Sequence, residues 1–384
     1  MNRLNRIKAT WIFLCIFGVY IMGFFVHAIY LHKTVYGDGV YYYSWLRSVI
    51  EDHDINFSNE YIRLDGAQPA IRTGIPGNKY SVGPAILWTP VYTEIRNVIR
   101  GDGYALPYQL SVGLTSVLAA LFALVLLFHI LCRYFSQKIS IMVIAVLAGA
   151  TNLLFYGSVD AVNSHALSFF TAVVFLALLL SNRKQWFAIG FALGFLGLIR
   201  TQDLVYGIFL LPFLKKNNVM KIVAGITIPY LPQLLAWQVL YGKFWISPYL
   251  TGAEGFHFLS PNILGVLFGV GSGLFLWTPV TVLGIAGLFT GSLNRIPMRI
   301  RMIAVFTLEV YLVSSWSTWW QGASFSGRMF VSSLPIMAFG IASVFSWLSK
   351  FRFTQAYYLL IFVIPLSLLN ALSIVYFLAL PHGR

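Results

Sequence analysis

Long apolar runs alternate with short polar segments along almost the whole chain. The runs lie near residues 11–31, 107–131, 139–156, 165–181, 186–199, 204–214, 219–240, 263–290, 302–320, 329–348 and 355–379. Because about 20 apolar residues in a helix cross the hydrocarbon layer of a bilayer, this pattern predicts an all-α, polytopic bundle of about 11 spans. The runs at 186–199 and 204–214 are too short to cross alone, so we expect tilted helices or two half-helices that meet. Four glycines between residues 265 and 273 predict a broken or re-entrant start for the run at 263–290.

Composition supports a membrane protein and excludes two other classes. Hydrophobic residues make up 58% of the chain, charged residues make up 10%, and the mean hydropathy is +0.77, which does not fit a soluble globular domain. The net charge of +14 does not indicate nucleic-acid binding, because the basic residues form short clusters between apolar runs rather than a stripe. Cys15 and Cys132 lie in or beside different spans, so no disulfide between them is expected.

The basic clusters predict how the chain is oriented. They are Arg3/Arg6/Lys8, Arg133/Lys138, Arg183/Lys184, Lys215/Lys216/Lys221, Arg295/Arg299/Arg301 and Lys350/Arg352. All six fall on one side of the predicted bundle, which the positive-inside rule makes the cytoplasmic side. The segments that then face outward are 32–106, 157–164, 200–203, 241–262 and 316–328. We expect a multi-pass protein of a bacterial cytoplasmic (inner) membrane, with its N-terminus in the cytoplasm and its C-terminus outside.

The acidic residues are concentrated on the outer side, since eight of the 12 lie in the segment 32–106. We interpret residues 1–384 as a single membrane domain, in which 32–106 is an outer loop too small to be a domain of its own. Within this loop, Val40–Ile50 and Ala85–Ile99 each have an aromatic and apolar face, which predicts two juxtamembrane helices. Ile71–Pro84 between them is rich in Gly and Pro and predicts an ordered loop.

Asp38 is the first candidate for a chemical role. It follows the first span and lies between Gly37 and Gly39, which let the backbone bend and approach a ligand closely. An Asp in this place is also a common helix cap, and taken alone the cap is the more frequent case. Polar residues at the outer ends of other spans favour a site instead. They are Asp160, His165, Arg200, Asp203, Glu254 and Arg328.

Two outer turns carry several of these residues. Asp160 and His165 lie where the fourth span begins, and His165 would help to hold a phosphate or an acceptor hydroxyl near a helix N-terminus. The structural alternatives are a solvated loop charge and an interfacial histidine with a backbone partner. Arg200 and Asp203 are either site residues or an internal ion pair. Glu309 lies inside the ninth span, so it is either a structural hydrogen-bonding partner or an indication of transport.

The strongest local signal is the segment from Trp316 to Arg328, with the sequence WSTWWQGASFSGR. Tryptophans at a membrane edge are ordinary interfacial anchors, but Gly322 and Gly327 bracket a tight loop that delivers Arg328 to the start of the tenth span. A guanidinium matches phosphate oxygens in a two-pronged contact. Lys79 is a second candidate phosphate contact, and its structural alternative is a solvated loop lysine.

Together these segments resemble the GT-C superfamily of integral-membrane glycosyltransferases, which use polyprenyl-phosphate-linked sugars. The shared features are an Asp soon after the first span (Tyr36-Gly-Asp38-Gly-Val-Tyr-Tyr), a loop leading into a surface helix (Tyr80 to Pro90), the pair Ser164-His165, Arg200 at a short helix turn, and a Trp-rich loop ending in Gly327-Arg328. The resemblance is greatest to the group of ArnT and the protein O-mannosyltransferases, and to RgtA/B/C/D-like proteins. The chain departs from several subfamilies because Asp38 lacks an acidic neighbour, and acceptor recognition is expected to come from the loops or a partner.

The resemblance implies inverting transfer of a sugar from a polyprenyl-phosphate donor to a lipid, glycan or protein acceptor at the outer face of the membrane. Asp38 would act as general base on the acceptor hydroxyl. Substrate binding, with stabilisation of the leaving phosphate, would fall to Arg328, Lys79, His165, Arg200, Asp160 and Tyr80. No cofactor is expected, because the arrangement requires no metal, although Asp38 with Asp160 could bind a divalent ion. The expected partners are the donor, the acceptor and the lipid bilayer, without nucleic acid.

Two other functions compete with this interpretation. A transporter or flippase of an amphipathic lipid or lipid-linked sugar is favoured by the Gly- and Pro-broken spans and by Glu309. The lack of an inverted repeat and the scarcity of charge inside the bundle weigh against it. The third function is a non-catalytic scaffold, in which the outer loop is a partner surface.

Overall fold

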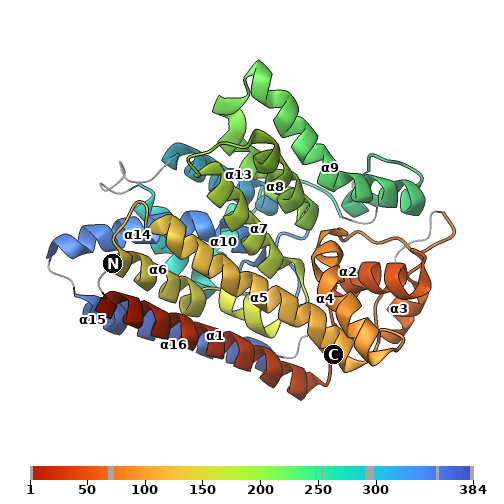
Figure 1. Ribbon diagram of the computed structural model, residues 1–384, viewed down its shortest axis with the longest axis horizontal. Helices are drawn as coiled ribbons and strands as arrows, with labels where there is room; N and C mark the ends of the chain where they lie inside the picture. The colour runs from red at the N-terminus through yellow and green to blue at the C-terminus, as the bar shows by residue number, and fades with distance from the viewer. Residues whose placement is uncertain are drawn as a thin grey trace.

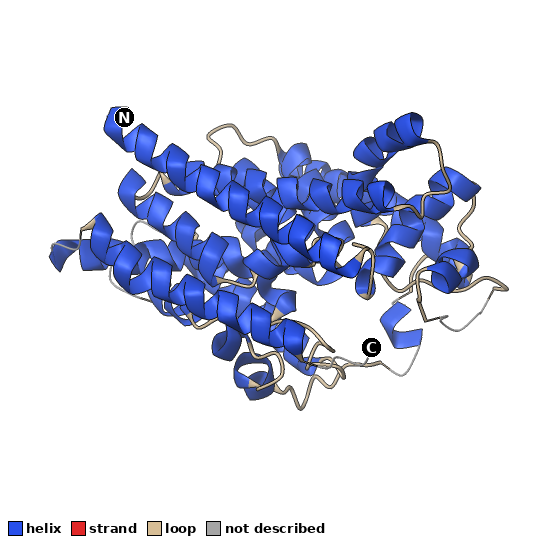
Figure 2. Cartoon of the chain, turned by 90° about the horizontal axis from the view of Figure 1, so that it is seen from below, coloured by secondary structure: helices blue, strands red, loops and turns tan. Residues whose placement is uncertain are grey.

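The structure is a computed structural model that describes residues 3–67, 73–246, 248–251, 254–289, 298–351 and 354–380. In these ranges the regular elements are helices, joined by turns and loops (Figures 1 and 2). An isolated bridge of extended residues pairs Phe256 with Trp316 in antiparallel orientation. The all-α bundle predicted from the hydrophobic pattern is confirmed. Parts of the predicted outer loop and basic clusters, namely Ile71, Arg72, Arg295 and Arg352, lie outside the described residues.

Most of the predicted apolar runs form helices of the bundle. Within the described ranges, five segments are long and apolar enough to cross a membrane. They correspond to α1 (Arg3–Leu31), α5 (Leu106–Leu131), α9 (Lys216–Tyr241), η6 with α14 (Arg328–Ser333 and Leu334–Leu348), and α15, η8 and α16 (Gln355–Tyr358, Leu359–Val363 and Ile364–Ala379). Three shorter apolar helices are α6 (Gln137–Ala150), α7 (Ser164–Leu179) and α8 (Trp186–Ile199). In Figure 1, α1, α5, α6 and α16 lie side by side.

The remaining predicted spans are irregular. The run at 204–214 is a 3-10 helix, η3 (Thr201–Phe213), and the run at 263–290 is divided into α10 (Ile263–Phe268), α11 (Leu274–Trp277) and α12 (Val280–Gly287). The break between α10 and α11 falls on the predicted glycine-rich stretch. α13 (Arg299–Ser315) ends at Ser315 rather than near residue 320, because Trp316 is extended and pairs with Phe256.

The outer-loop helices gather at one end of the bundle, beside the end of α1 (Figure 1). They are α2 (Asp38–Arg47), η1 (Ser48–Asp52), α3 (Ser58–Arg63) and α4 (Gly83–Ile99). Of the predicted apolar faces, Tyr42, Trp45 and Trp88 are buried, while Val49 is 48% exposed. The buried side chains form one hydrophobic cluster that also includes bundle residues such as Tyr108. These helices therefore pack their aromatic faces on protein, and their place beside the membrane surface stays a prediction.

Close backbone contacts fix the elements at the end of the bundle where Arg200 lies. A Cβ atom at Gly190 or Gly194 of α8 would collide with backbone oxygens of α9, so these small residues let the two helices lie in direct contact. At the outer end of α8, a Cβ atom at Gly83 would lie 2.6 Å from the Leu198 carbonyl oxygen. The start of α4 therefore lies against the end of α8, immediately before Arg200.

A second glycine contact joins α12 to α14 and gives a stability prediction. A Cβ atom at Gly340 would overlap the carbonyl oxygen of Gly284. We therefore expect Gly340→Val to force the two helices apart and to destabilise the protein, by about 1–3 kcal/mol for such overpacking. Thermal unfolding of the detergent-solubilised protein, followed by tryptophan fluorescence, measures this. Gly18→Val in α1, where nothing lies within 4 Å of the new Cβ, is the control, and equal midpoints for the two variants would contradict the prediction.

Candidate functional site

Asp38 is the first residue of α2, and the glycines on either side of it have separate structural roles. Gly37 has a φ angle of 53°, in the left-handed region that residues other than glycine rarely adopt. A Cβ atom at Gly39 would collide with the carbonyl oxygen of Val162. The first glycine therefore allows the sharp turn into α2, and the second lets α2 touch the segment that leads into α7.

The carboxylate of Asp38 contacts two side chains from distant parts of the chain. Its Oδ2 accepts from Nη1 of Arg328 at 2.7 Å, and its Oδ1 accepts from the hydroxyl of Tyr80 at 2.7 Å. These bonds show a role other than the helix cap considered from the sequence. Burial raises the pKa of this carboxyl group, but Arg328 and the Tyr80 hydrogen bond outweigh it and hold the pKa below its usual value.

The loop before α4 is fixed to the bundle on both sides of Tyr80. The Ser81 hydroxyl donates to the Ile199 carbonyl oxygen at 2.8 Å, and the Val82 amide donates to Gln233 Oε1 at 2.9 Å. Lys79 forms an ion pair with Glu254, which fixes its ammonium group at this end of the loop. The second oxygen of Glu254 accepts from the indole nitrogen of Trp316 at 3.1 Å.

The loop 316–327 has the strained backbone that its sequence suggests. Gly322 has a φ angle of 67°, and the side-chain-bearing Gln321 and Ser326 also have positive φ angles of 62° and 52°. The carbonyl oxygen of Gly327 accepts from Asn152 Nδ2 at 3.0 Å, which ties the end of the loop to the bundle. This conformation delivers Arg328 to the first position of η6, where its side chain is 16% exposed.

Arg200 lies between α8 and η3 and is held from several sides. Its Nη1 donates to Ser164 Oγ at 2.9 Å and to Nδ1 of His165 at 3.2 Å. His165 is almost fully buried, and its ring lies 4.6 Å from that of Tyr156. These contacts place His165 behind Arg200, as a residue that orients the guanidinium.

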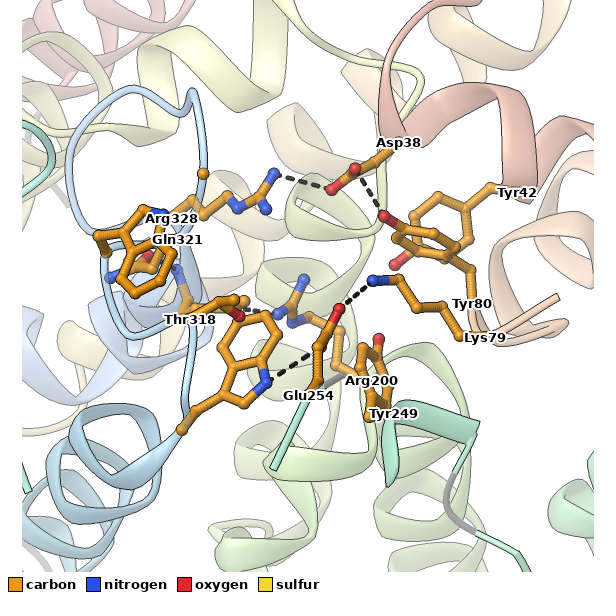
Figure 3. A pocket seen from close by; sticks show the side chains of 14 residues that line it. Asp38, Tyr42, Lys79, Tyr80, Arg200, Tyr249, Glu254, Thr318, Gln321 and Arg328 are labelled. Atoms are coloured by element: carbon orange, nitrogen blue, oxygen red, sulfur yellow. Dashed lines mark hydrogen bonds and ion pairs between the residues drawn. The ribbon is translucent and has the colours of Figure 1, made fainter. Parts of the chain in front are cut away.

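The residues described above surround a cavity of about 190 Å³. Figure 3 shows Asp38, Arg200 and Arg328 pointing into it from different elements, with Lys79 and Glu254 joined nearby. It is lined by Asp38, Tyr42, Lys79, Tyr80, Arg200, Tyr249, Glu254, Trp316, Thr318, Trp320, Gln321, Gly322, Arg328 and Met329. Three of these side chains are cationic and two are anionic, so the lining has a net charge of +1. A positively charged cavity with aromatic walls is suited to an anionic ligand that has apolar faces.

Several polar atoms at the cavity are buried without a partner among the described residues. They include Nε of Arg200 and of Arg328, Oγ1 of Thr318 and Nε2 of Gln321. A buried donor without an acceptor costs free energy. These atoms therefore favour the binding of a ligand or water that brings polar groups to them. Because most of the atoms belong to donors, acceptor oxygens fit them best.

The structure brings together five of the seven residues predicted from the sequence. Asp38, Lys79, Tyr80, Arg200 and Arg328 line the cavity, whereas His165 and Asp160 are absent from its lining. Asp160 accepts from Asn163 Nδ2 at 3.4 Å, in the turn between η2 (Phe155–Val159) and α7. Burial, together with the charge of Asp38, raises the pKa of Asp160 to about 7.

Sequence reasoning did not assign several lining residues to the site. Glu254 was counted among the polar residues that favour a site but was given no role, Trp316 and Trp320 were interpreted as interfacial anchors, and Tyr249 was not considered. The acidic character of Glu254 was a usable signal, since only four acidic residues lie beyond the first outer loop. Tyr249 gave no signal.

The donor set at the cavity does not fit a metal ion. Within the described residues there is no group of three or more His, Cys, Asp or Glu side chains that could hold one. Both carboxylates of the lining already have cationic partners, Asp38 with Arg328 and Glu254 with Lys79. A divalent ion prefers several oxygen ligands, and the two carboxylates of the lining, each paired with a cation, do not supply them.

Comparison with known proteins identifies the fold. No family model and no curated protein matches the chain. The oligosaccharyltransferase of Archaeoglobus fulgidus, solved in complex with zinc and sulfate, superposes with a TM-score of 0.56 at 13% identity, over 95% of this chain and 52% of that one. A structure of the archaeal oligosaccharyltransferase AglB from the same organism, in complex with an inhibitory peptide and a dolichol-phosphate, gives 0.52 and 11%, over 98% and 55%. This chain spans about half the length of these proteins, and it is an all-α, multi-pass membrane protein with a GT-C-like fold.

Proposed function

We propose that this protein is an inverting glycosyltransferase that moves a sugar from a polyprenyl-phosphate carrier to an acceptor hydroxyl. The observation that carries the proposal is the contact of Asp38 with Arg328 at a cavity with net positive charge. Asp38 can take a proton from the acceptor hydroxyl, and Arg328 can stabilise the phosphate as it leaves. The GT-C-like fold supports this chemistry by analogy.

The cationic residues suit the phosphate of the donor. Arg328 and Arg200 present guanidinium groups, which make two-pronged contacts with phosphate oxygens. Lys79 contributes a third positive charge from the opposite loop. As the bond to the sugar breaks, negative charge grows on the phosphate, and positive groups already in place lower the energy of that transition state.

The same contact gives Asp38 a basicity that depends on the donor. Arg328 lowers the pKa of Asp38, which makes the carboxylate a weak base while the ion pair is intact. A donor phosphate that attracts Arg328 would weaken this effect and raise the pKa. Asp38 would then accept the proton of the acceptor hydroxyl as that oxygen attacks the anomeric carbon, from the face opposite the phosphate. The product would have inverted anomeric configuration.

The surroundings of the cavity suit a lipid-linked donor. Phe256, which pairs with Trp316 of the lining, is 40% exposed, and Phe258, Leu264 and Phe268 beyond it are 47%, 73% and 54% exposed. Exposed apolar patches are typical of surfaces that lipid or another apolar ligand covers. An isoprenoid chain could therefore follow this surface while its sugar phosphate enters the cavity. We infer that the cavity faces the outer side of a bacterial cytoplasmic membrane, and that the protein acts in the manner of the ArnT-like and protein O-mannosyltransferase-like enzymes that its sequence resembles.

The proposed function predicts consumption of a lipid-linked sugar by the purified protein in nanodiscs. Radiolabelled polyprenyl-monophosphate sugars are offered in a panel, with a lipid-linked oligosaccharide as a competing donor class. We expect one monophosphate donor to release polyprenyl phosphate and to pass its label to an acceptor or to water. If no donor is consumed or bound, the proposal is wrong. If a donor is bound and moved across liposome membranes unchanged, the protein is a flippase.

A further inference from the structure

Two acidic side chains lie inside the bundle, behind the cavity rather than in its lining. Asp203 of η3 and Glu309 of α13 are both 0% exposed. The hydroxyl oxygen of Ser332 lies between them, 2.9 Å from Asp203 Oδ1 and 3.0 Å from Glu309 Oε1. The sequence left Glu309 open as a structural partner or an indication of transport, and its contacts place it in a hydrogen-bonded pair.

The number of protons at Ser332 restricts the charge of this pair. A serine hydroxyl has one proton and can donate it to only one of the two carboxyl oxygens. The other oxygen, at the same distance, must then carry a proton of its own and donate it to Ser332. Two buried carboxylates without that proton would repel each other in a region with little water. We propose that Asp203 and Glu309 share a single bound proton and act together as a positioning pair for the cations of the cavity.

The other hydrogen bonds of the pair agree with one shared proton. Ser168 bonds to Asp203 Oδ2, and Ser333 bonds to Glu309 Oε2. With the shared proton at Ser332, the two outer oxygens carry no proton, so Ser168 and Ser333 each donate to them. Every contact is satisfied whichever carboxyl holds the proton, so the proton belongs to the pair rather than to one residue.

Gln202 connects the pair to Arg200. Its amide nitrogen donates to Glu309 Oε1 at 3.3 Å and to the Met329 carbonyl oxygen at 2.9 Å. Its amide oxygen accepts from Nη2 of Arg200 at 3.3 Å. The amide nitrogen of Gln202 thus donates to Glu309 and Met329, while its amide oxygen holds Arg200, so Glu309 helps to orient the group that contacts Arg200.

The pair also fixes the helix that begins with Arg328. Ser332 and Ser333 belong to η6, which starts at Arg328, and both serines bond to the acidic pair. The two guanidinium groups that enter the cavity in Figure 3 are thus anchored by the same pair. This role rests on the proposed function, because it matters most if those groups bind a phosphate. If both carboxylates were ionised, their two negative charges would offset the net charge of +1 of the cavity lining. One shared proton halves the negative charge of the pair.

Infrared difference spectroscopy of the detergent-solubilised protein tests the shared proton. A protonated carboxyl has a C=O stretching band that an ionised carboxylate lacks and that shifts in D₂O. Comparison of wild type with Asp203→Asn and Glu309→Gln isolates the contribution of the pair from that of other buried acids. With one shared proton, each single variant loses the whole band, because its remaining carboxyl is ionised. Loss of half the band in each variant indicates two protons, and no loss indicates none; either result overturns the proposal.

Donor binding tests the positioning role independently. Glu309→Gln keeps an acceptor oxygen for Gln202 and is expected to bind the radiolabelled donor like wild type. Glu309→Leu removes that acceptor and is expected to raise the Kd and KM of the donor about tenfold, as for the loss of one buried hydrogen bond, with a smaller change in kcat. Ser332→Ala is a smaller change that disturbs folding less, and it is expected to weaken donor binding similarly. Glu94→Leu, at an exposed position, is the control.

The two tests distinguish failure of this inference from failure of the proposed function. If wild type binds no donor, the proposed function fails, while the infrared band still decides how many protons the pair holds. If wild type binds donor and both Glu309→Leu and Ser332→Ala bind it equally well, the positioning role is wrong.

Discussion

Asp38→Asn is expected to slow sugar transfer strongly while donor binding is kept or becomes tighter, because the net charge of the lining rises from +1 to +2. The amide has almost the same shape as the carboxylate, so it can still accept from the Tyr80 hydroxyl, which lies 2.7 Å from Asp38 Oδ1. It cannot take a proton from the acceptor. A positioned general base contributes about 10²–10⁴-fold to a rate, so the loss of kcat should lie in that range. Single-turnover transfer with a radiolabelled donor measures it.

Asp65→Asn is the matched control for this variant. Asp65 belongs to the same outer loop, its side chain is 87% exposed, and it contacts only Lys33 at 3.9 Å among the ion pairs of the described residues. Its substitution should leave the transfer rate unchanged. Transfer by Asp38→Asn at the wild-type rate would remove Asp38 as the base, and lost donor binding would indicate that Asp38 mainly holds the cavity in shape.

The Asp38 motif illustrates what a sequence can predict about this site. A charged residue between two glycines, next to a membrane span, is unusual enough to single out. In the structure each of the two glycines has a separate structural role. The helices were predictable for a similar reason, because apolar runs of about 20 residues have few alternatives to spanning a bilayer. The irregular elements η3 and α10–α12 also follow from short or glycine-rich runs.

The contacts that complete the cavity could not be predicted from local sequence. Lys79 and Glu254 are 175 residues apart, and Asp38 and Arg328 are 290 residues apart. Such pairs arise from the packing of the whole bundle, which local patterns do not encode. His165 shows the opposite error, since its position at a helix start suggested a ligand contact while packing placed it behind Arg200.

Arg328→Gln is expected to have the second large effect, through two separate consequences. Loss of a positioned charge that stabilises a leaving group lowers kcat by about 10²–10³-fold in comparable sites. The donor should also bind more weakly, because the lining changes from a net charge of +1 to zero. Arg328→Lys keeps the charge without the two-pronged geometry, so its activity should lie between those of Gln and wild type. Equal activity of all three proteins would exclude a role for Arg328 with the phosphate.

The pH profile of kcat/KM separates this role from a purely structural one. Burial alone would raise the pKa of Asp38, and Arg328 is the largest influence that lowers it. In wild type the carboxylate therefore stays ionised at pH values below the usual range for Asp. Without Arg328 the pKa rises, so the acid limb of the profile, which reports the free enzyme, should move to higher pH in Arg328→Gln and less in Arg328→Lys. An acid limb that stays in place after Arg328→Gln would show that Arg328 does not control the basicity of Asp38, even if the rate falls.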